Sequence, residues 1–369
     1  MTLEEIRVRL SALDRQLLTL MAERQELSRQ VAEAKQAEGR GIRDFARERE
    51  VLMQARANAQ ALGISPALAE SVMRMLIRSS LTAQERIRVS ETGGGTGKSA
   101  LVIGGGGKMG RWFTEFLSSQ GYAVVVADPG SPTADGNGGR EWIRDWRNAP
   151  MNTDLVVVAT PIKVANEVLK ELAARKPSGV VFDIGSLKTP LRTGLTALKD
   201  AGVRVTSIHP MFGPDTELLS GRHVIFVNVG HDEAVKQAQA LFGSTMAEQV
   251  VMSLDEHDRL IAYVLGLSHA LNIAFFTALA ESGEAAPRLA QLSSTTYDSQ
   301  VDVATKVANE SPELYFEIQS LNDYGKDSLL ALKHAVDRIY DCVSQRDAQC
   351  FIGMMNRGRE YLAGRERER

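Results

Sequence analysis

Apolar side chains recur at helical spacing through the first part of the chain. They stand three, four or seven positions apart, as on one helix face, at Leu3, Ile6, Leu10, Leu13, Leu17, Leu20, Leu27 and Val31. Thr2, followed three residues later by Glu5, has the pattern of a capping box that starts a helix. Because neither Gly nor Pro occurs before Gly39, the pattern predicts one helix of about 50 Å.

Two shorter helices are predicted to follow. Asp44 can cap a helix that continues to Leu62. Ser65-Pro66 combines a cap with proline at the first helical position, and opens a third helix that runs to about Arg88. Since one long helix with two shorter companions leaves part of its apolar stripe uncovered, we expect an interlocked homodimer.

The pattern changes at Leu101. Apolar, β-branched runs then alternate with helical stretches, as in a parallel, doubly wound sheet, at 101–103, 123–127, 155–159, 180–182, 203–207 and 223–227. After Ser253 the chain is predicted to be helical to about Leu362. We therefore expect a multidomain protein with an all-α helical domain (1–89), a flexible Gly/Ser-rich linker (90–99), an α/β Rossmann-type domain (100–252) and a second all-α domain (253–362).

Composition narrows the classes of function. The net charge is −3 and 24% of residues are charged, which favours neither nucleic acid nor a membrane surface. The sequence predicts no signal peptide, no apolar stretch long enough to span a bilayer and no metal site. Cys342 and Cys350 are expected in one helix, about 12 Å apart, too far to bridge. These features indicate a reduced, cytoplasmic protein.

A glycine-rich turn follows the first run of the sheet. Gly105, Gly107 and Gly110 have the spacing of a dinucleotide-binding turn, in which they permit the tight turn, the approach of a pyrophosphate and close helix packing; the motif also contains Lys108 and Met109. Asp128 ends the second run, where a carboxylate accepts hydrogen bonds from the ribose hydroxyls. No arginine follows it closely, so we expect NAD rather than NADP as cofactor. The alternative is a purely structural turn.

Charged and polar residues in the helical segment are also spaced for a common site. Arg24 and Lys35 are eleven positions apart, which places them within about 20° on one helix face. Arg7 lies roughly 100° round the helix from Arg24 and faces elsewhere, for which the site of a partner chain is a natural destination. The alternative for each residue is a solvated helix face.

Residues 1–88 resemble the all-helical chorismate mutases. The polar set that carries the resemblance is Arg7, Arg24, Lys35, Asp44, Arg47, Glu48, Ser80 and Gln84. The resemblance implies that Arg24 and the partner subunit's Arg7 hold the two carboxylates of chorismate, and that Lys35 and Gln84 donate to its ether oxygen. It further implies that Glu48, with the backbone near Asp44 and Arg47, holds the ring hydroxyl, while Ser80 helps to place a carboxylate.

The rest of the chain, from Ala100 to about Leu362, resembles prephenate dehydrogenases. The motifs are 102–110, 159–161, 183–188, 256–258 and, most specifically, the block His209–Pro214. The resemblance implies that His209 accepts a hydrogen bond from the C4 hydroxyl of prephenate, that Ser186 orients His209, and that Thr160 and Pro161 line the nicotinamide pocket. It also implies NAD as cofactor, a homodimer and feedback inhibition by tyrosine.

One histidine and one aspartate in the dehydrogenase segment leave alternative roles open. His269 matches a substrate-region histidine of the family, but a satisfied core histidine is equally compatible with its apolar surroundings. In the family an arginine that binds the ring carboxylate follows the tyrosine of a Ser-Ser-x-x-Tyr run, whereas this chain has Asp298 after Tyr297. Either another cation, such as Arg288 or Lys306, replaces it, or the dehydrogenase is impaired, or the substrates are 4-amino-4-deoxy analogues.

We therefore expect a bifunctional enzyme of tyrosine biosynthesis. Its amino-substituted counterpart, which would lead to 4-aminophenylalanine, is the second hypothesis. A third is a non-catalytic sensor that binds NADH without turnover, against which the complete polar set of the helical segment and the His209 block both argue.

Overall fold

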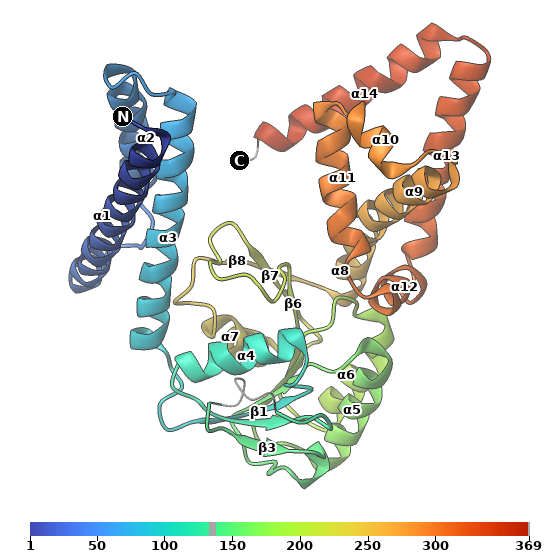
Figure 1. Ribbon diagram of the computed structural model, residues 1–369. Coiled ribbons are helices and arrows are strands. Elements are labelled where there is room, and N and C mark those ends of the chain that lie inside the picture. Colours follow the sequence, from blue (N-terminus) through green and yellow to red (C-terminus); the bar gives the residue numbers. More distant parts are fainter. Residues whose placement is uncertain (133–137, 368–369) are drawn as a thin grey trace. The chain divides into compact units, whose positions relative to one another are not determined.

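The computed structural model describes residues 1–132 and 138–367, and these divide into two compact units (Figure 1). The first unit comprises Met1–Gly185 and Thr193–Met252, and therefore contains both the N-terminal helices and the sheet. The second comprises Ser186–Arg192 and Ser253–Arg369, and is helical. The combination of helical, α/β and helical parts agrees with the fold class expected from the sequence.

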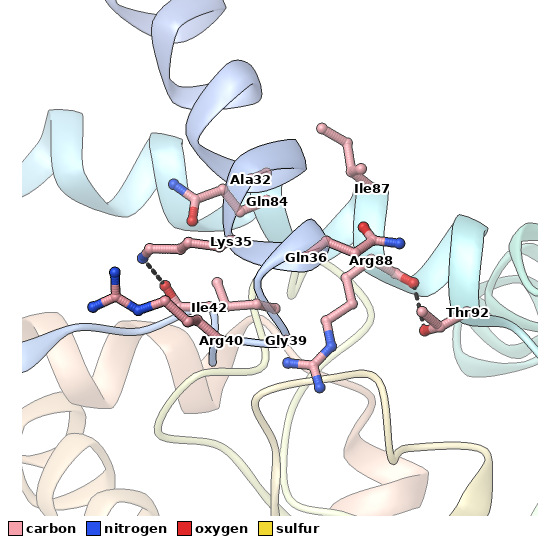
Figure 2. A pocket seen from close by; sticks show the side chains of 10 residues that line it. All are labelled: Ala32, Lys35, Gln36, Gly39, Arg40, Ile42, Gln84, Ile87, Arg88 and Thr92. Atoms are coloured by element: carbon pink, nitrogen blue, oxygen red, sulfur yellow. Dashed lines mark hydrogen bonds between the residues drawn. The ribbon is translucent and has the colours of Figure 1, made fainter.

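Three helices open the first unit: α1 (Leu3–Ala37), α2 (Phe45–Ala61) and α3 (Pro66–Thr92). The expected capping box is present, with Thr2 and Glu5 each binding the other's backbone N–H. No residue of α1 is buried within this chain, so its apolar face remains free to bind another surface. Figure 2 shows where the end of α1 and the loop after it face α3, with Lys35 near Gln84.

The expected flexible linker is instead packed. Helix α3 continues to Thr92, and Gly95 N donates to the carbonyl oxygen of Gln120 at 3.0 Å. A Cβ on Gly93 would lie 2.5 Å from Gln120 Cα, and one on Gly95 would lie 2.3 Å from the ring of Tyr122. The glycines here allow close packing rather than mobility, and a prediction from composition alone could not distinguish the two.

The sheet has eight strands in the order β3-β2-β1-β4-β5-β6-β7-β8. Their bounds are β1 (Ser99–Ile103), β2 (Ala123–Ala127), β3 (Glu141–Ile143), β4 (Leu155–Val158), β5 (Val180–Asp183), β6 (Val205–Pro210), β7 (His223–Val227) and β8 (Glu248–Met252). The first six strands of this order are parallel, as expected, but β7 runs antiparallel to β6 and parallel to β8. The prediction of a wholly parallel sheet is therefore wrong at this edge.

Alternation along the strands assigns the two faces of the sheet. Ala100 and Val102 belong to the cluster built with Phe113 and Leu117 of α4 (Lys108–Ser119) and with apolar residues of α7 (Asp232–Ala240). Leu101 and Ile103 point to the opposite face and are equally buried. Helix α5 (Ile162–Arg175), which follows β4, buries its own apolar face, while the short helices η1 (Trp146–Asn148), η2 (Thr189–Leu191) and α6 (Arg192–Asp200) complete the connections.

The second unit is built from consecutive helices. They are α8 (Leu254–Ile261), the π-helical turn η3 (Ala262–Leu267), α9 (Ser268–Glu281), α10 (Ala286–Gln291), α11 (Thr295–Ala308), α12 (Pro312–Ser320), α13 (Gly325–Ser344) and α14 (Ala348–Arg367). The run Leu254–Glu281 is continuous and contains an 18-residue window with a mean hydropathy of 1.6, so the expectation of no bilayer-length apolar stretch is wrong by length and composition. A core helix of a soluble protein passes the same test, and polar Asn272 is buried within this run and bonded to Gln300.

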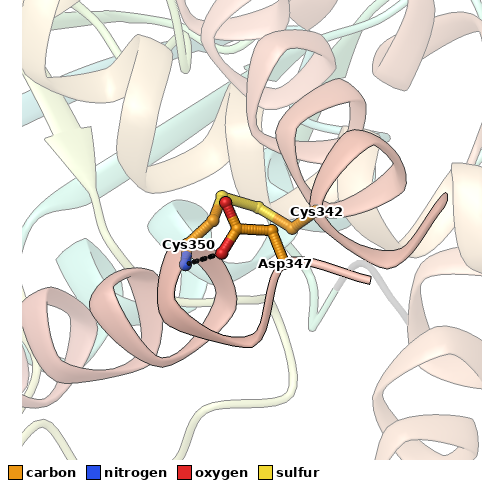
Figure 3. The surroundings of a disulfide bond; sticks show 3 residues. All are labelled: Cys342, Asp347 and Cys350. Atoms are coloured by element: carbon orange, nitrogen blue, oxygen red, sulfur yellow. Dashed lines mark hydrogen bonds between the residues drawn. A yellow bond between two sulfur atoms is a disulfide. The ribbon is translucent and has the colours of Figure 1, made fainter. Parts of the chain in front are cut away.

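Cys342 and Cys350 form a disulfide, which contradicts the expectation of two separated thiols (Figure 3). The expectation placed both in one helix, whereas α13 ends at Ser344 and α14 begins at Ala348. Asp347 closes the turn, because its N–H donates to Cys342 O and its carboxylate accepts from Cys350 N. The reversal brings the two Cα atoms to 5.8 Å. The prediction of a reduced protein is therefore not supported by this structure.

Candidate active sites

Seven of the eight polar residues predicted for the mutase surround one cavity of about 270 Å³ between α1, α2 and α3. We call it the helical cavity. The residues are Arg24, Lys35, Asp44, Arg47, Glu48, Ser80 and Gln84, together with apolar walls from Leu27, Val31, Ile42, Val51, Ile77 and Leu81. Residues from positions 24 to 84 thus converge on a site that helical spacing alone could not bring together.

Arg24 is fixed at one end of the helical cavity. Its Nη1 donates to the carbonyl oxygen of Leu76 at 2.9 Å and to Ser80 Oγ at 2.6 Å. Ser28, which the sequence analysis did not single out, donates to the same Ser80 hydroxyl at 2.8 Å. Partial burial lowers the pKa of Arg24, although a guanidinium keeps its charge at any physiological pH. The arrangement presents a positioned cation suited to a carboxylate.

Away from Arg24, Lys35 and Gln84 lie near each other in the helical cavity (Figure 2). Lys35 Nζ donates to the carbonyl oxygen of Ile42, and buried Gln84 has an Oε1 atom without a partner among the described residues. Both also line an adjoining cavity of about 170 Å³, which Gln36, Arg40 and Arg88 border. Two side chains that can donate hydrogen bonds, one charged and one neutral, thus line the same two cavities.

Asp44 and Glu48 contribute the acids of the helical cavity. Asp44 caps α2 by accepting from Arg47 N at 3.0 Å, and this bond, with the nearby Lys35 and Arg40 charges, lowers its pKa. Glu48 is held by Arg43, whose Nε lies 2.9 Å from its carboxylate. Arg47 itself points outward to Glu50, so its backbone rather than its charge belongs to this site.

Arg7 does not reach the helical cavity of its own chain. It lies seventeen residues before Arg24 on α1, about 25 Å along the helix axis, and is exposed beside Glu4. The exposed apolar side chains of α1, among them Leu10, Leu13 and Leu17, lie between these two positions. A second copy packed along α1 would bring its own Arg7 to a site that this chain leaves incomplete.

The glycine-rich turn joins β1 to α4. A Cβ on Gly110 would lie 2.2 Å from Gly104 O, and one on Gly105 would lie 2.6 Å from Val126. Gly107 precedes α4, and its Cβ would meet nothing closer than 3.4 Å. Gly104 was not among the glycines predicted for the turn, yet it has φ +83° and its Cβ would strike the carbonyl of Ala159. Gly104 is the first of four consecutive glycines, and this run is the sequence signal that could have identified it.

Asp128 lies against this turn. Its Oδ2 accepts from Gly106 N and its Oδ1 from Gly130 N, both at 2.9 Å. A Cβ on Gly106 would come within 2.7 Å of the carboxyl carbon, which explains a second glycine that the motif did not include. Each oxygen keeps a lone pair for a ribose hydroxyl. Exposed Gly107 and Lys108, with half-buried Met109, follow at the start of α4, whose N-terminal N–H groups suit a phosphate.

Polar groups gather at the carboxyl ends of the central strands. Thr160 follows the end of β4 by two residues and lies beside Gly104, and its Oγ1 is buried without a partner among the described residues; Pro161 is the N-cap residue of α5. His209 is 3% exposed in β6, on the same face of that strand as Ser207, whose hydroxyl is likewise unpartnered in the described part of the chain. This edge, at the point where strand order reverses between β1 and β4, is where open α/β sheets bind ligands.

In the second unit, a buried pair organises the segment that begins at Ser186. Asp258 accepts from Lys188 N at 3.0 Å and from Thr189 N, and lies 2.6 Å from Nδ1 of His257. Burial acts to raise the pKa of Asp258, but the hydrogen bonds from His257 and Thr189 outweigh it and lower the pKa. Both side chains are fully buried.

His269 and Asp298 occupy different environments in this unit. Burial lowers the pKa of His269 to about 4, its Nδ1 lacks a partner among the described residues, and its ring lies 4.2 Å from that of Tyr315. The histidine is therefore not fully satisfied by the described residues. Asp298 is exposed in the first turn of α11 and accepts from Ser293 Oγ at 3.3 Å.

Family models match three stretches of the chain. Residues 6–85 match chorismate mutase type II, residues 141–251 the nucleotide-binding domain of prephenate dehydrogenase, and residues 253–357 its dimerization domain. The last match covers the apolar run Leu254–Glu281. The glycine-rich turn lies ahead of the second matched stretch and rests on the geometry above.

Known proteins match across most of the chain. A T-protein of Enterobacter agglomerans is 28% identical over 98% of this chain and 93% of its own length. A 4-amino-4-deoxyprephenate dehydrogenase of Streptomyces pristinaespiralis is 30% identical over 75% of this chain and 96% of its own. The solved structure of a prephenate dehydrogenase from A. aeolicus, in complex with hydroxyphenyl propionate and NAD+, shares the fold, with a TM-score of 0.56 at 17% identity over 72% of this chain and 98% of that one. The chain belongs to the family of bifunctional enzymes that join a chorismate mutase to an NAD-dependent prephenate dehydrogenase and serve tyrosine biosynthesis.

Proposed function

We propose that the helical cavity is the site that rearranges chorismate to prephenate. The observation that carries the proposal is the convergence of Arg24, Lys35 and Gln84 on one small cavity. The reaction is pericyclic and needs neither a nucleophile nor proton transfer. Catalysis must therefore come from holding a compact conformer and from stabilising charge at the ether oxygen, for which fixed cations and amide donors are suited.

Each polar side chain of the helical cavity has a role in this proposal. Arg24, with Ser80, binds one carboxylate of chorismate, and the partner subunit's Arg7 binds the other. Lys35 leaves the carbonyl of Ile42 and, with the amide of Gln84, donates to the ether oxygen as its bond to the ring breaks. Glu48 accepts from the ring hydroxyl, and the N-terminus of α2, capped by Asp44 and including Arg47, supports it.

For the dehydrogenase we propose His209 as the group that accepts the proton of the C4 hydroxyl of prephenate. As this proton leaves, a hydride departs from C4 and the ring carboxylate is released as CO₂, which makes the ring aromatic. An imidazole can accept a proton near pH 7, and the imidazole of His209 is buried at this edge of the sheet. We assign Ser186 to the orientation of His209 and His269 to the substrate, and Thr160 and Pro161 to the nicotinamide pocket.

The turn between β1 and α4 fits NAD. Gly105 and Gly110 stand where a Cβ would collide with backbone or Val126, Gly107 leaves room for a pyrophosphate, and Asp128 faces the turn with a carboxylate that repels a 2′-phosphate. We assign the N–H groups of Lys108 and Met109, in the first turn of α4, to the same phosphate. When bound, NAD⁺ supplies the acceptor for the hydride.

A second candidate substrate is favoured by Asp298. An exposed carboxylate stands where relatives place a cation for the ring carboxylate, and the relative from Streptomyces pristinaespiralis is a 4-amino-4-deoxyprephenate dehydrogenase. A 4-amino group is cationic, and Asp44 and Glu48 supply acids in the helical cavity as well. Prephenate remains the first candidate, with Arg288 or Lys306 as the replacement cation.

The test is NADH formation at 340 nm with purified protein and NAD⁺, comparing prephenate with 4-amino-4-deoxyprephenate. Each substrate is also generated in situ from its chorismate precursor, which reports on both sites at once. A higher kcat/KM for prephenate supports tyrosine biosynthesis. A higher kcat/KM for the amino compound moves the chain to 4-aminophenylalanine synthesis, and NADH binding without turnover of either substrate would indicate a sensor.

The remaining organisation follows from the same proposal. We assign residues 1–89 to the mutase domain, 90–99 to a connector, 100–252 to the NAD domain and 253–362 to the helical dehydrogenase domain. The active form is a homodimer that works in the cytoplasm and binds neither nucleic acid nor a membrane. Tyrosine acts as a feedback inhibitor, which inhibition of the NADH assay by added tyrosine would test.

A further inference from the structure

The helical cavity rests on a loop of the sheet domain. The loop joins β6 to β7, and its residues Leu218, Leu219 and Ser220 are separated from the cavity by more than 130 positions in sequence. Leu218 is 7% exposed and packs with Ile42 and Leu81, both of which line the helical cavity. The floor of the cavity is thus supported by an apolar side chain from the other half of the chain.

Glu85 binds the next residue of the loop. Its Oε2 accepts from Leu219 N at 2.8 Å, and its Oε1 accepts from Met246 N at 2.6 Å. The side chain is 3% exposed, and burial raises its pKa while the two N–H donors oppose the rise. Because Glu85 immediately follows Gln84 on α3, its two bonds fix the rotation of α3 that points Gln84 into the cavity.

Ser220 completes the set of contacts. Arg43 donates from Nη1 to Ser220 Oγ at 2.7 Å while its Nε and second Nη hold the carboxylate of Glu48. The neighbour of Arg43, Ile42, supplies the carbonyl that binds Lys35. Each of the three consecutive loop residues therefore contacts a residue that is itself bonded or adjacent to a polar residue of the cavity: Lys35, Gln84 or Glu48.

We propose that the segment Leu218–Ser220 of the dehydrogenase half positions the mutase site, with Arg43 and Glu85 as the positioning residues that transmit it. The inference rests on the proposed function of the helical cavity. Trp112 also holds this loop, because its Nε1 donates to Thr216 O at 3.1 Å. The mutase site of this chain is consequently not self-contained within its three helices.

Full-length variants test this role. Leu218→Ala should lower mutase kcat/KM by roughly 2- to 30-fold, the range that residues outside a ligand site usually show, and Ser220→Ala by less. Ser220→Thr restores the hydroxyl and should restore activity. Glu217→Ala is the matched control in the same loop, because Glu217 is exposed and pairs only with Arg86 among the described residues. Mutase turnover is followed by loss of chorismate, and dehydrogenase turnover by NADH formation from added prephenate.

A double-mutant cycle identifies the route. Arg43→Ala and Ser220→Ala act on one hydrogen bond, so the double variant should lose no more mutase activity than Arg43→Ala alone. Strictly additive losses would contradict the route through Arg43. Equal losses of both activities with a lowered melting temperature would reduce the segment to a structural role and overturn the inference.

Failure of this inference is separable from failure of the proposed function. If Lys35→Ala abolishes mutase turnover while the loop variants keep wild-type mutase kinetics, the cavity is the site and the positioning role is wrong. If Lys35→Ala leaves turnover intact, the proposed function of the helical cavity is itself wrong.

Discussion

The glycine-rich turn offers the sharpest test of the dehydrogenase site, because two of its glycines should fail in different ways. In Gly110→Ala the new methyl carbon would lie 2.2 Å from Gly104 O and 2.7 Å from Gly105 Cα. Both obstacles are backbone, so the turn itself must shift by about 1 Å to restore ordinary contact. Overpacking of this kind costs about 1–3 kcal/mol.

The cost should appear in stability. For a domain of this size, 1 kcal/mol lowers the melting temperature by roughly 2–4 °C, so Gly110→Ala should lower it by roughly 2–12 °C. In Gly107→Ala the methyl carbon meets nothing closer than 3.4 Å, and φ is −70°, so the fold should accept it within about 0.5 kcal/mol. The same methyl group would occupy the approach of the pyrophosphate, and the KM for NAD⁺ should rise at least about tenfold, or 1.4 kcal/mol.

The assays are calorimetry and NADH formation with prephenate at varied NAD⁺, with mutase turnover as the internal control. Mutase activity should remain at the wild-type level in Gly107→Ala, because the helical cavity contains no residue of the turn. A wild-type KM for NAD⁺ in Gly107→Ala would refute the assignment of the turn to the pyrophosphate. An unchanged melting temperature in Gly110→Ala would refute the packing role of the third glycine.

Three further outcomes follow from the sites. Arg7→Ala and Arg24→Ala should each abolish mutase activity alone. Mixing and re-associating the two variants should restore part of the activity, since one site of the mixed dimer contains both arginines. No recovery would mean that each site lies within one subunit. Asp298→Arg should shift the ratio of kcat/KM values toward prephenate and away from the amino analogue by more than about tenfold if position 298 faces the ring, because an arginine would repel the cationic amine of the analogue but not the neutral hydroxyl of prephenate; an unchanged ratio would remove Asp298 from the site. Burial lowers the pKa of His269 to about 4, so the folded state favours the neutral imidazole; its stabilising contribution is complete above the unfolded pKa near 6.5 and is lost as the pH falls from there toward 4. Calorimetry should therefore show that the stability of His269→Gln is less sensitive to acid than that of the wild type. Equal acid sensitivity of the two proteins would contradict the burial of His269.

Local features were predictable because they depend on neighbours in sequence. The capping box at Thr2, the cap at Asp44 and proline at the start of α3 fixed where helices begin. The spacing of Gly105, Gly107 and Gly110 indicated a nucleotide turn before any contact was known. The polar set of the helical cavity followed from a resemblance, and the structure brings seven of its eight members together.

Errors arose where the chain reverses or where distant segments meet. The two cysteines were placed in one helix, but a turn at Gln345–Asp347 pairs them, and no apolar period marks such a turn. The glycines of the connector resembled those of a flexible linker, since composition cannot show that Gln120 and Tyr122 stand against them. The antiparallel direction of β7 was likewise invisible, because alternation of side chains is the same in both directions.

By itself the sequence determined most of the helices and strands, the fold class and the nucleotide turn, because periodicity, caps and glycine spacing act over a few residues. Only the tertiary structure decided that Arg43 reaches Ser220 and that Glu85 holds Leu219 and Met246. These contacts join residues more than 130 positions apart, and no sequence period connects them. Buried donors and acceptors must nevertheless be paired, so the folded chain settles which distant partner each one finds.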